Sequence, residues 1–155
     1  HIDRLHNMPW RLQIERISEL SMQYNRAKIC CDATGPGDAV VESMTEMGLP
    51  VEAFWINNVV KIPLIEKLVL AIAGRTIFYP YHADLLRELE NYEQVISEKT
   101  SNYKFSAPAG QTDDLVIALA LALHLLGEGG VLDPGVFTGM LHGGLSVGTE
   151  AFACL

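Results

Sequence analysis

Three aspartates have the residue type and the surroundings to hold a cation. Asp113 and Asp114 are adjacent and immediately precede residues 115–126, a run that contains no Asp, Glu, Lys or Arg. Asp32 lies far upstream, where it closes the short, mostly apolar segment 27–31. Carboxylate oxygens are the ligands that hard divalent cations prefer in proteins. These acids could therefore bind a cation if the fold brings them together.

The paired acids also have a structural explanation. Residues 115–126 are too few to cross a bilayer, which needs about 20 apolar residues, so they indicate a helix buried in a core. Thr112 or Asp113 could cap the N-terminus of this helix, where acids contribute about 0.3–1 kcal/mol. Taken alone, the stretch favours capping over cation binding, and the rest of the chain adds weight to cation binding.

Asp32 has three further interpretations. It precedes the turn Ala33-Thr34-Gly35-Pro36-Gly37, and its carboxylate could accept hydrogen bonds from the backbone N–H groups of this turn. A dinucleotide-binding loop would need a third glycine, which this turn lacks. A methyltransferase cofactor loop also places an acid before Gly-x-Gly, but the next expected strand ends in Ile56-Asn57-Asn58, without an acid for a ribose. The dinucleotide and methyltransferase signals are both weak.

The elements that would position these acids alternate along the chain. Helical spacing of apolar residues predicts helices, and short β-branched or apolar runs predict strands. Helices are expected over residues 11–24, 38–47, 61–73, 83–97 and 113–126, and strands over 2–7, 27–31, 51–56, 76–79 and 103–106. This order predicts an α/β fold with a parallel or mixed sheet, in which ligands collect at the carboxyl ends of strands. Asp32 and the two helix acids can meet there.

Two charged residues, Lys61 and Glu88, lie outside this set. Lys61 follows the Asn57-Asn58 turn; a lysine in such a place usually extends into solvent, and a functional one could reach a phosphate. Glu88 lies in the helix expected over residues 83–97, and we predict that it points outward with its charged neighbours.

Composition narrows the class of protein. The 155 residues are 49% hydrophobic and 19% charged, which is enough apolar sequence for one folded domain. The formal net charge of −8 argues against binding to nucleic acid by bulk charge alone, although metal ions can neutralise a cluster of acids. Cys30 and Cys31 are neighbours in an expected strand and should face opposite sides, and no Cys/His spacing indicates zinc. A cytoplasmic setting fits, with no signal peptide or membrane span.

Several segments, taken in order, resemble one family. They are the turn at residues 32–37, the Lys61 helix with Leu64 and Ile65, the Glu88-Leu89 pair, residues 103–108, and Thr112-Asp113-Asp114 leading into residues 118–122. Together they resemble the C-terminal nuclease domain of the large terminase subunit of tailed phages. The resemblance covers residues 11–126. It implies a nuclease domain over residues 1–126. Residues 127–155 are rich in glycine, so we expect a tail that is loosely packed or disordered.

The resemblance carries expectations about fold and chemistry. It implies a ribonuclease H-like fold, a mixed central sheet flanked by helices, and a two-metal site for Mg²⁺ or Mn²⁺. Asp32 would be the second-strand acid, either Asp113 or Asp114 would be the helix acid, and Lys61 would contact DNA. Family members cut concatemeric double-stranded DNA in the host cytoplasm during genome packaging. There they work with an ATPase domain, a portal and a small terminase subunit.

The sequence departs from the family pattern in two places. Thr112 stands where the family usually has a histidine. The family's first acid lies on a strand that precedes His1, so we expect the domain to lack its N-terminal strands and to cut weakly alone. Two other functions stay open: a non-catalytic ribonuclease H-like assembly module, in which Asp113 and Asp114 only cap the helix, and a cofactor-binding α/β enzyme such as a methyltransferase.

Overall fold

The computed structural model describes residues 1–96, 103–127 and 151–154, and all structural statements below refer to them. The helices are α1 (Trp10–Gln23), α2 (Gly37–Glu46), α3 (Asn58–Ala73), α4 (Ala83–Asn91) and α5 (Asp114–Leu125). The strands are β1 (Lys28–Asp32), β2 (Val51–Phe54), β3 (Glu93–Ile96), β4 (Tyr103–Ser106) and β5 (Ala151–Cys154). Within these ranges, no helix combines the length and the apolar character needed to span a membrane.

The central sheet has the strand order β2-β1-β5, and β1 is parallel to both neighbours. Its middle strand is buried on both faces, as a parallel strand covered by helices should be. Cys30 packs into the core on the α3 and α5 side, whereas Cys31 packs on the α1 and α2 side. The prediction that these two cysteines face opposite ways is therefore confirmed.

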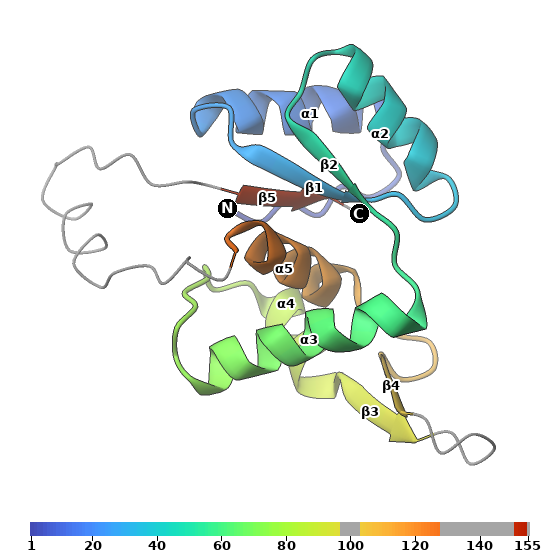
Figure 1. Cartoon of the computed structure of the whole chain (residues 1–155), viewed down its shortest axis with the longest axis vertical. Helices are drawn as coiled ribbons and strands as arrows, with labels where there is room; N and C mark the ends of the chain where they lie inside the picture. The colour runs from blue at the N-terminus through green and yellow to red at the C-terminus, as the bar shows by residue number, and fades with distance from the viewer. Residues whose placement is uncertain (97–102, 128–150, 155) are drawn as a thin grey trace, which may run out of the picture.

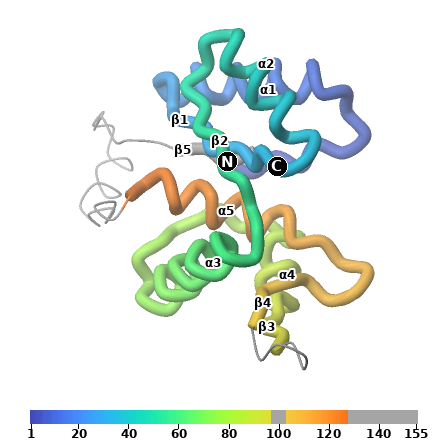
Figure 2. Tube along the Cα trace, turned by 45° about the vertical axis from the view of Figure 1, so that its right-hand side comes forward, coloured from blue at the N-terminus to red at the C-terminus, as the bar shows by residue number. Residues whose placement is uncertain are grey.

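Helices cover both faces of this sheet. Figure 1 shows α1 and α2 on one face and α5 on the other, with α3 and α4 beyond α5, and Figure 2 shows the same order from another direction. Six residues of α5 are buried: Leu115, Val116, Ile117, Ala120, Leu121 and Leu123. The prediction of a core helix is confirmed. Buried residues of α5 pack in one core cluster with Cys30 of β1, which holds the N-terminus of α5 beside this strand.

Some predicted elements differ in the structure. Residues 2–7 and 76–79 form no strand. The helix expected over residues 83–97 ends at Asn91, because Tyr92 adopts an extended conformation (φ −73°, ψ 123°). The following residues then form β3, which pairs antiparallel with β4. Val95 and Ile96 are β-branched and favour a strand, so the pairing with β4 prevails over continued helix.

One segment of the glycine-rich tail differs from the expectation of loose packing. Residues 151–154 form β5, which is paired in parallel with β1 at Lys28–Cys31. Residues 128–150 and 155 lie outside the described residues, so the rest of the tail prediction is not addressed. A short strand of this kind carries no periodicity that separates it from a loop, and its partner strand lies far away in the sequence.

Candidate active site

The head of α5 is not capped by its own residues. Asp113 is the N-cap residue (φ −123°, ψ 19°), but its side chain makes no capping hydrogen bond. Thr112 uses its hydroxyl to donate to Glu88 Oε1 at 3.0 Å. The prediction that Thr112 or Asp113 is the N-cap residue is confirmed for the position of Asp113, but neither side chain makes the capping hydrogen bond.

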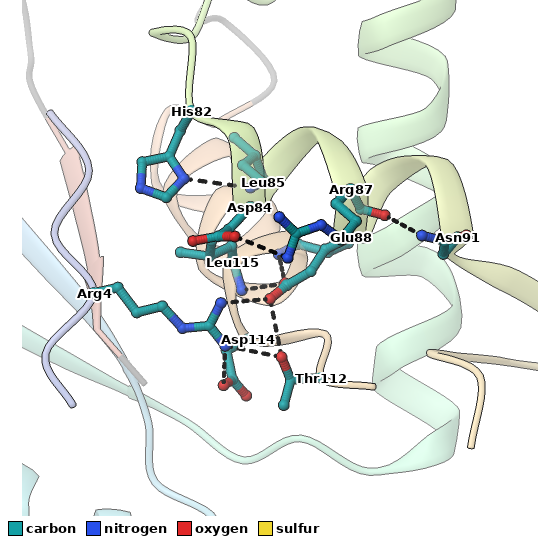
Figure 3. Close-up of polar contacts among 11 residues, drawn as sticks. Arg4, His82, Asp84, Leu85, Arg87, Glu88, Asn91, Thr112, Asp114 and Leu115 are labelled. Carbon is teal, nitrogen blue, oxygen red and sulfur yellow. Dashed lines mark hydrogen bonds and ion pairs between the residues drawn. The ribbon is translucent and has the colours of Figure 1, made fainter. Parts of the chain in front are cut away.

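Glu88 of α4 caps α5 instead. Its Oε2 accepts hydrogen bonds from the backbone N–H groups of Leu115 at 2.7 Å and Val116 at 3.3 Å. The side chain is 8% exposed, so the expectation that Glu88 points outward is wrong. Figure 3 shows this carboxylate at the centre of the polar contacts between α4 and the head of α5.

Arg4 completes this network from the N-terminal segment. Its guanidinium lies 3.3 Å from Glu88 Oε1, donates to Thr112 Oγ1 at 2.9 Å, and lies 3.7 Å from Asp114 Oδ2. Asp114 itself is 59% exposed, so its carboxylate is largely open to solvent. The Arg4 guanidinium therefore offsets the charge of the buried Glu88 carboxylate, and Figure 3 shows it in contact with Glu88, Thr112 and Asp114.

Asp113 points to α3 rather than to its own helix. Its Oδ2 accepts a hydrogen bond from Lys61 Nζ at 2.8 Å, and the side chains are 18% (Lys61) and 27% (Asp113) exposed. Lys61 lies in the first turn of α3, which is capped by the side chain of Asn57. The same ammonium lies 5.8 Å from the centre of the Tyr92 ring, within the range of a cation–π contact. Lys61 is thus a partner of Asp113, not a solvated surface lysine.

Tyr92 closes this side of the site. Burial, and next the neighbouring Asp113 carboxylate, raise the pKa of its phenol above the ordinary value of 10.0, which moves its ionisation even further from neutral pH. Its buried hydroxyl has no hydrogen-bond partner among the described residues. Tyr92 therefore gives Asp113 an uncharged, water-poor neighbour, which strengthens the attraction of Asp113 for a cation.

Asp32 lies at the carboxyl end of β1, as predicted. Its Oδ1 accepts a hydrogen bond from Thr34 N at 2.8 Å, so the turn-stabilising interpretation holds for one of its two oxygens. Thr34 Oγ1 in turn accepts from Ile56 N at 2.9 Å, which ties this turn to the segment between β2 and α3. A Cβ atom on Gly37 would overlap the Asp32 carbonyl oxygen, so the turn needs glycine at that position.

Two cavities open beside these acids. One of about 380 Å³ is lined by Arg4, Thr112 and Asp114, and a second of about 110 Å³ by Asp32, Thr34 and Gly37. Gln13 and Ile17 of α1 line both cavities. The carboxylates of Asp32 and Asp114 thus open on neighbouring cavities that the same two α1 side chains border.

The donor chemistry fits a hard divalent cation. One oxygen of Asp32 accepts from the turn, and one oxygen of Asp113 accepts from Lys61. None of the carboxylates of Asp32, Asp113 and Asp114 accepts a hydrogen bond from the amides of α5. No hydrogen bond links Asp32 to either helix acid across residues 1–96 and 103–127. Within the same residues, no group of three or more His, Cys, Asp or Glu side chains is close enough to hold an ion. A metal site shared by the three acids stays a prediction.

The sequence did not reveal the roles of Glu88 and Arg4. Glu88 follows Leu85 by three residues and precedes Tyr92 by four, which is the spacing of one helix face. That spacing could have placed Glu88 on the buried side despite its charge. Arg4 carries no such signal, because nothing local distinguishes it from a surface arginine.

Comparison with known proteins gives a consistent set of relatives. No family model matches the chain. It is 30% identical over 126 residues to the large terminase subunits of Thermus phage G20c and Thermus virus P23-45. The match covers 78% of this chain and 25% of each relative. The chain thus spans about a quarter of the length of the curated relatives it matches.

Solved structures agree. The large terminase nuclease of phage G20c with bound magnesium superposes with a TM-score of 0.72 at 28% identity, covering 79% of this chain and 65% of that one. The nuclease domain of the Thermus phage P74-26 large terminase gives a TM-score of 0.72 at 26% identity, covering 84% and 68%. The G20c nuclease has also been crystallised with cobalt and with zinc.

Proposed function

Because this chain belongs to the nuclease domains of phage large terminase subunits, we propose that it is a metal-dependent DNA endonuclease domain that cuts concatemeric DNA during genome packaging. The expected α/β, ribonuclease H-like fold class is confirmed by its structural neighbours. The proposed substrate is double-stranded DNA in the host cytoplasm. The proposed partners are an ATPase domain, a portal and a small terminase subunit.

One observation carries the proposal beyond family membership. A buried helix that begins with two acids would ordinarily use them as caps, and here Glu88 takes that role. Asp113 and Asp114 are therefore available for another task. Asp113 is paired with Lys61 of α3, and Ile56, just before α3, donates its N–H to Thr34 in the Asp32 turn at 2.9 Å. These links support a site that Asp113 and Asp32 share.

Asp32 and one or both of Asp113 and Asp114 would hold Mg²⁺ or Mn²⁺, in a two-metal arrangement. Such ions would activate the attacking water and stabilise the leaving oxygen of a phosphodiester. Lys61 would neutralise Asp113 in the absence of metal and contact a DNA phosphate when the substrate is bound.

The test is Mn²⁺-dependent nicking of a supercoiled plasmid at high protein concentration. Asp32→Asn, Asp113→Asn and Asp114→Asn keep the side-chain volume and remove the negative charge. We expect Asp32→Asn and at least one of the other two to abolish nicking. Glu46→Gln, at an exposed position of α2, is the matched control and should cut like the native chain.

Calorimetry with Mn²⁺ separates the enzyme from the non-catalytic module. A helix head that serves only for packing gives no site-specific heat, whereas a metal site gives heat that Asp32→Asn removes. Undiminished cutting by all three variants, or a native chain with neither heat nor nicking, would end the proposal.

A further inference from the structure

We propose that Glu88 is a positioning residue of the candidate active site: it occupies the amides of α5 that Asp113 would otherwise bind and so keeps the Asp113 carboxylate directed away from its own helix. This inference rests on the proposed function and adds to it a residue that touches neither metal nor DNA.

An aspartate at the N-cap of a helix normally binds the helix's own amides. The first N–H groups of a helix lack partners within it, and the N-cap side chain usually accepts from the second or third helical residue. With Asp113 at the N-cap, those residues are Leu115 and Val116. They are the two N–H groups that Glu88 Oε2 binds at 2.7 and 3.3 Å. Glu88 and Asp113 therefore compete for the same donors.

Neighbouring side chains hold Glu88 in place at these amides. It is held by Thr112 Oγ1 at 3.0 Å and by the Arg4 guanidinium at 3.3 Å, and it is 8% exposed. Asp113 finds its own partner in Lys61 at 2.8 Å. The cap from α4 and the lysine from α3 thus act together on the direction of one carboxylate.

Two variants of equal length isolate the acceptor. Glu88→Met keeps the volume of the side chain and removes both oxygens, so the Asp113 side chain can turn onto the amides of Leu115 and Val116. Glu88→Gln keeps one oxygen that can accept from these amides. Glu90→Met, at an exposed position of the same helix, is the control.

The first measurement is amide hydrogen exchange at Leu115 and Val116, which requires neither metal nor activity. We expect both amides to stay protected in Asp113→Ala, because Glu88 binds them, and in Glu88→Met, because Asp113 replaces Glu88. Protection should be lost only in the double variant Glu88→Met/Asp113→Ala. Loss of protection in either single variant would overturn the proposal, because it would show that the two carboxylates do not compete.

The second measurement is Mn²⁺ affinity by calorimetry. Residues that orient a metal ligand typically contribute about 10–100-fold to affinity, and we expect Glu88→Met to lose that much. Glu88→Gln should bind much more tightly than Glu88→Met, and Glu90→Met should match the native chain. A Glu88→Met variant with native Mn²⁺ affinity would refute the positioning role.

The design separates this proposal from the proposed function. If the native chain binds no Mn²⁺, the proposed function fails, and the exchange pattern still decides whether Glu88 displaces Asp113. If Glu88→Met does not fold, Glu88→Gln decides alone: protected amides with native-like Mn²⁺ affinity support the proposal. Protected amides with lost affinity would overturn it, because the charge of Glu88 and not its capping would then matter.

Discussion

The ion pair between Lys61 and Asp113 should contribute measurably to stability. The two residues are 52 positions apart in the sequence, their charged atoms are 2.8 Å apart, and their side chains are 18% and 27% exposed. At this separation the Coulomb energy is about 1.5 kcal/mol in water and about 6 kcal/mol at an effective dielectric constant of 20. Desolvation and the ordering of both side chains offset most of the larger value. We therefore expect a coupling free energy of about 1–2 kcal/mol, above the range of exposed pairs.

The assay is a double-mutant cycle in metal-free buffer with Lys61→Met, Asp113→Asn and the double variant. Urea unfolding gives the free energy of unfolding of each protein, and the non-additive part is the coupling. The exposed pair Arg11–Glu15, with side chains 86% and 46% exposed, provides the control cycle. Its coupling should be about 0.3–0.5 kcal/mol and should decrease in high salt.

The two cycles should differ in both size and salt dependence. If the Lys61–Asp113 coupling is no larger than the control coupling, or if salt removes both equally, the pair is not sheltered from solvent. Lys61 would then not hold Asp113 toward α3, and Glu88 alone would direct the Asp113 carboxylate away from α5.

Three further outcomes are expected. Gly37→Ala should lower the melting temperature more than Gly35→Ala, because a Cβ at position 37 would overlap the Asp32 carbonyl oxygen. A Cβ at position 35 meets open space, and its positive φ of 61° costs an alanine about 1–2 kcal/mol. Equal decreases in melting temperature would contradict this. Burial raises the pKa of the Cys30 thiol to about 12, so peptide mapping after thiol labelling of the native chain at pH 8 should find Cys30 unmodified, and rapid labelling would contradict its burial. Burial raises the folded-state pKa of Cys30 and Tyr92 above the ordinary values of 9.0 and 10.0, so the unfolded chain loses these protons first as pH rises. The urea midpoint of unfolding should therefore fall as pH rises above about 9. A midpoint that stays constant would contradict this.

Local patterns were sufficient for the elements that present the acids. The apolar run after Asp114 predicted the core helix α5, because burial on most sides requires apolar side chains all round. The short run before Asp32 predicted β1, and adjacency in a strand predicted the opposite faces of Cys30 and Cys31. These properties depend on residues that are close to each other in the sequence, so they can be predicted from the sequence alone.

Only the tertiary structure decided which polar groups meet. Glu88 binds the α5 amides across 27 and 28 positions, and Lys61 reaches Asp113 across 52. A charged side chain on a helix looks the same in sequence whether it faces water or a buried helix end, because its partner comes from another element. For the same reason the sequence favoured Thr112 or Asp113 as the cap. The packing of α4 against α5 gave that task to Glu88 and left the aspartate to Lys61.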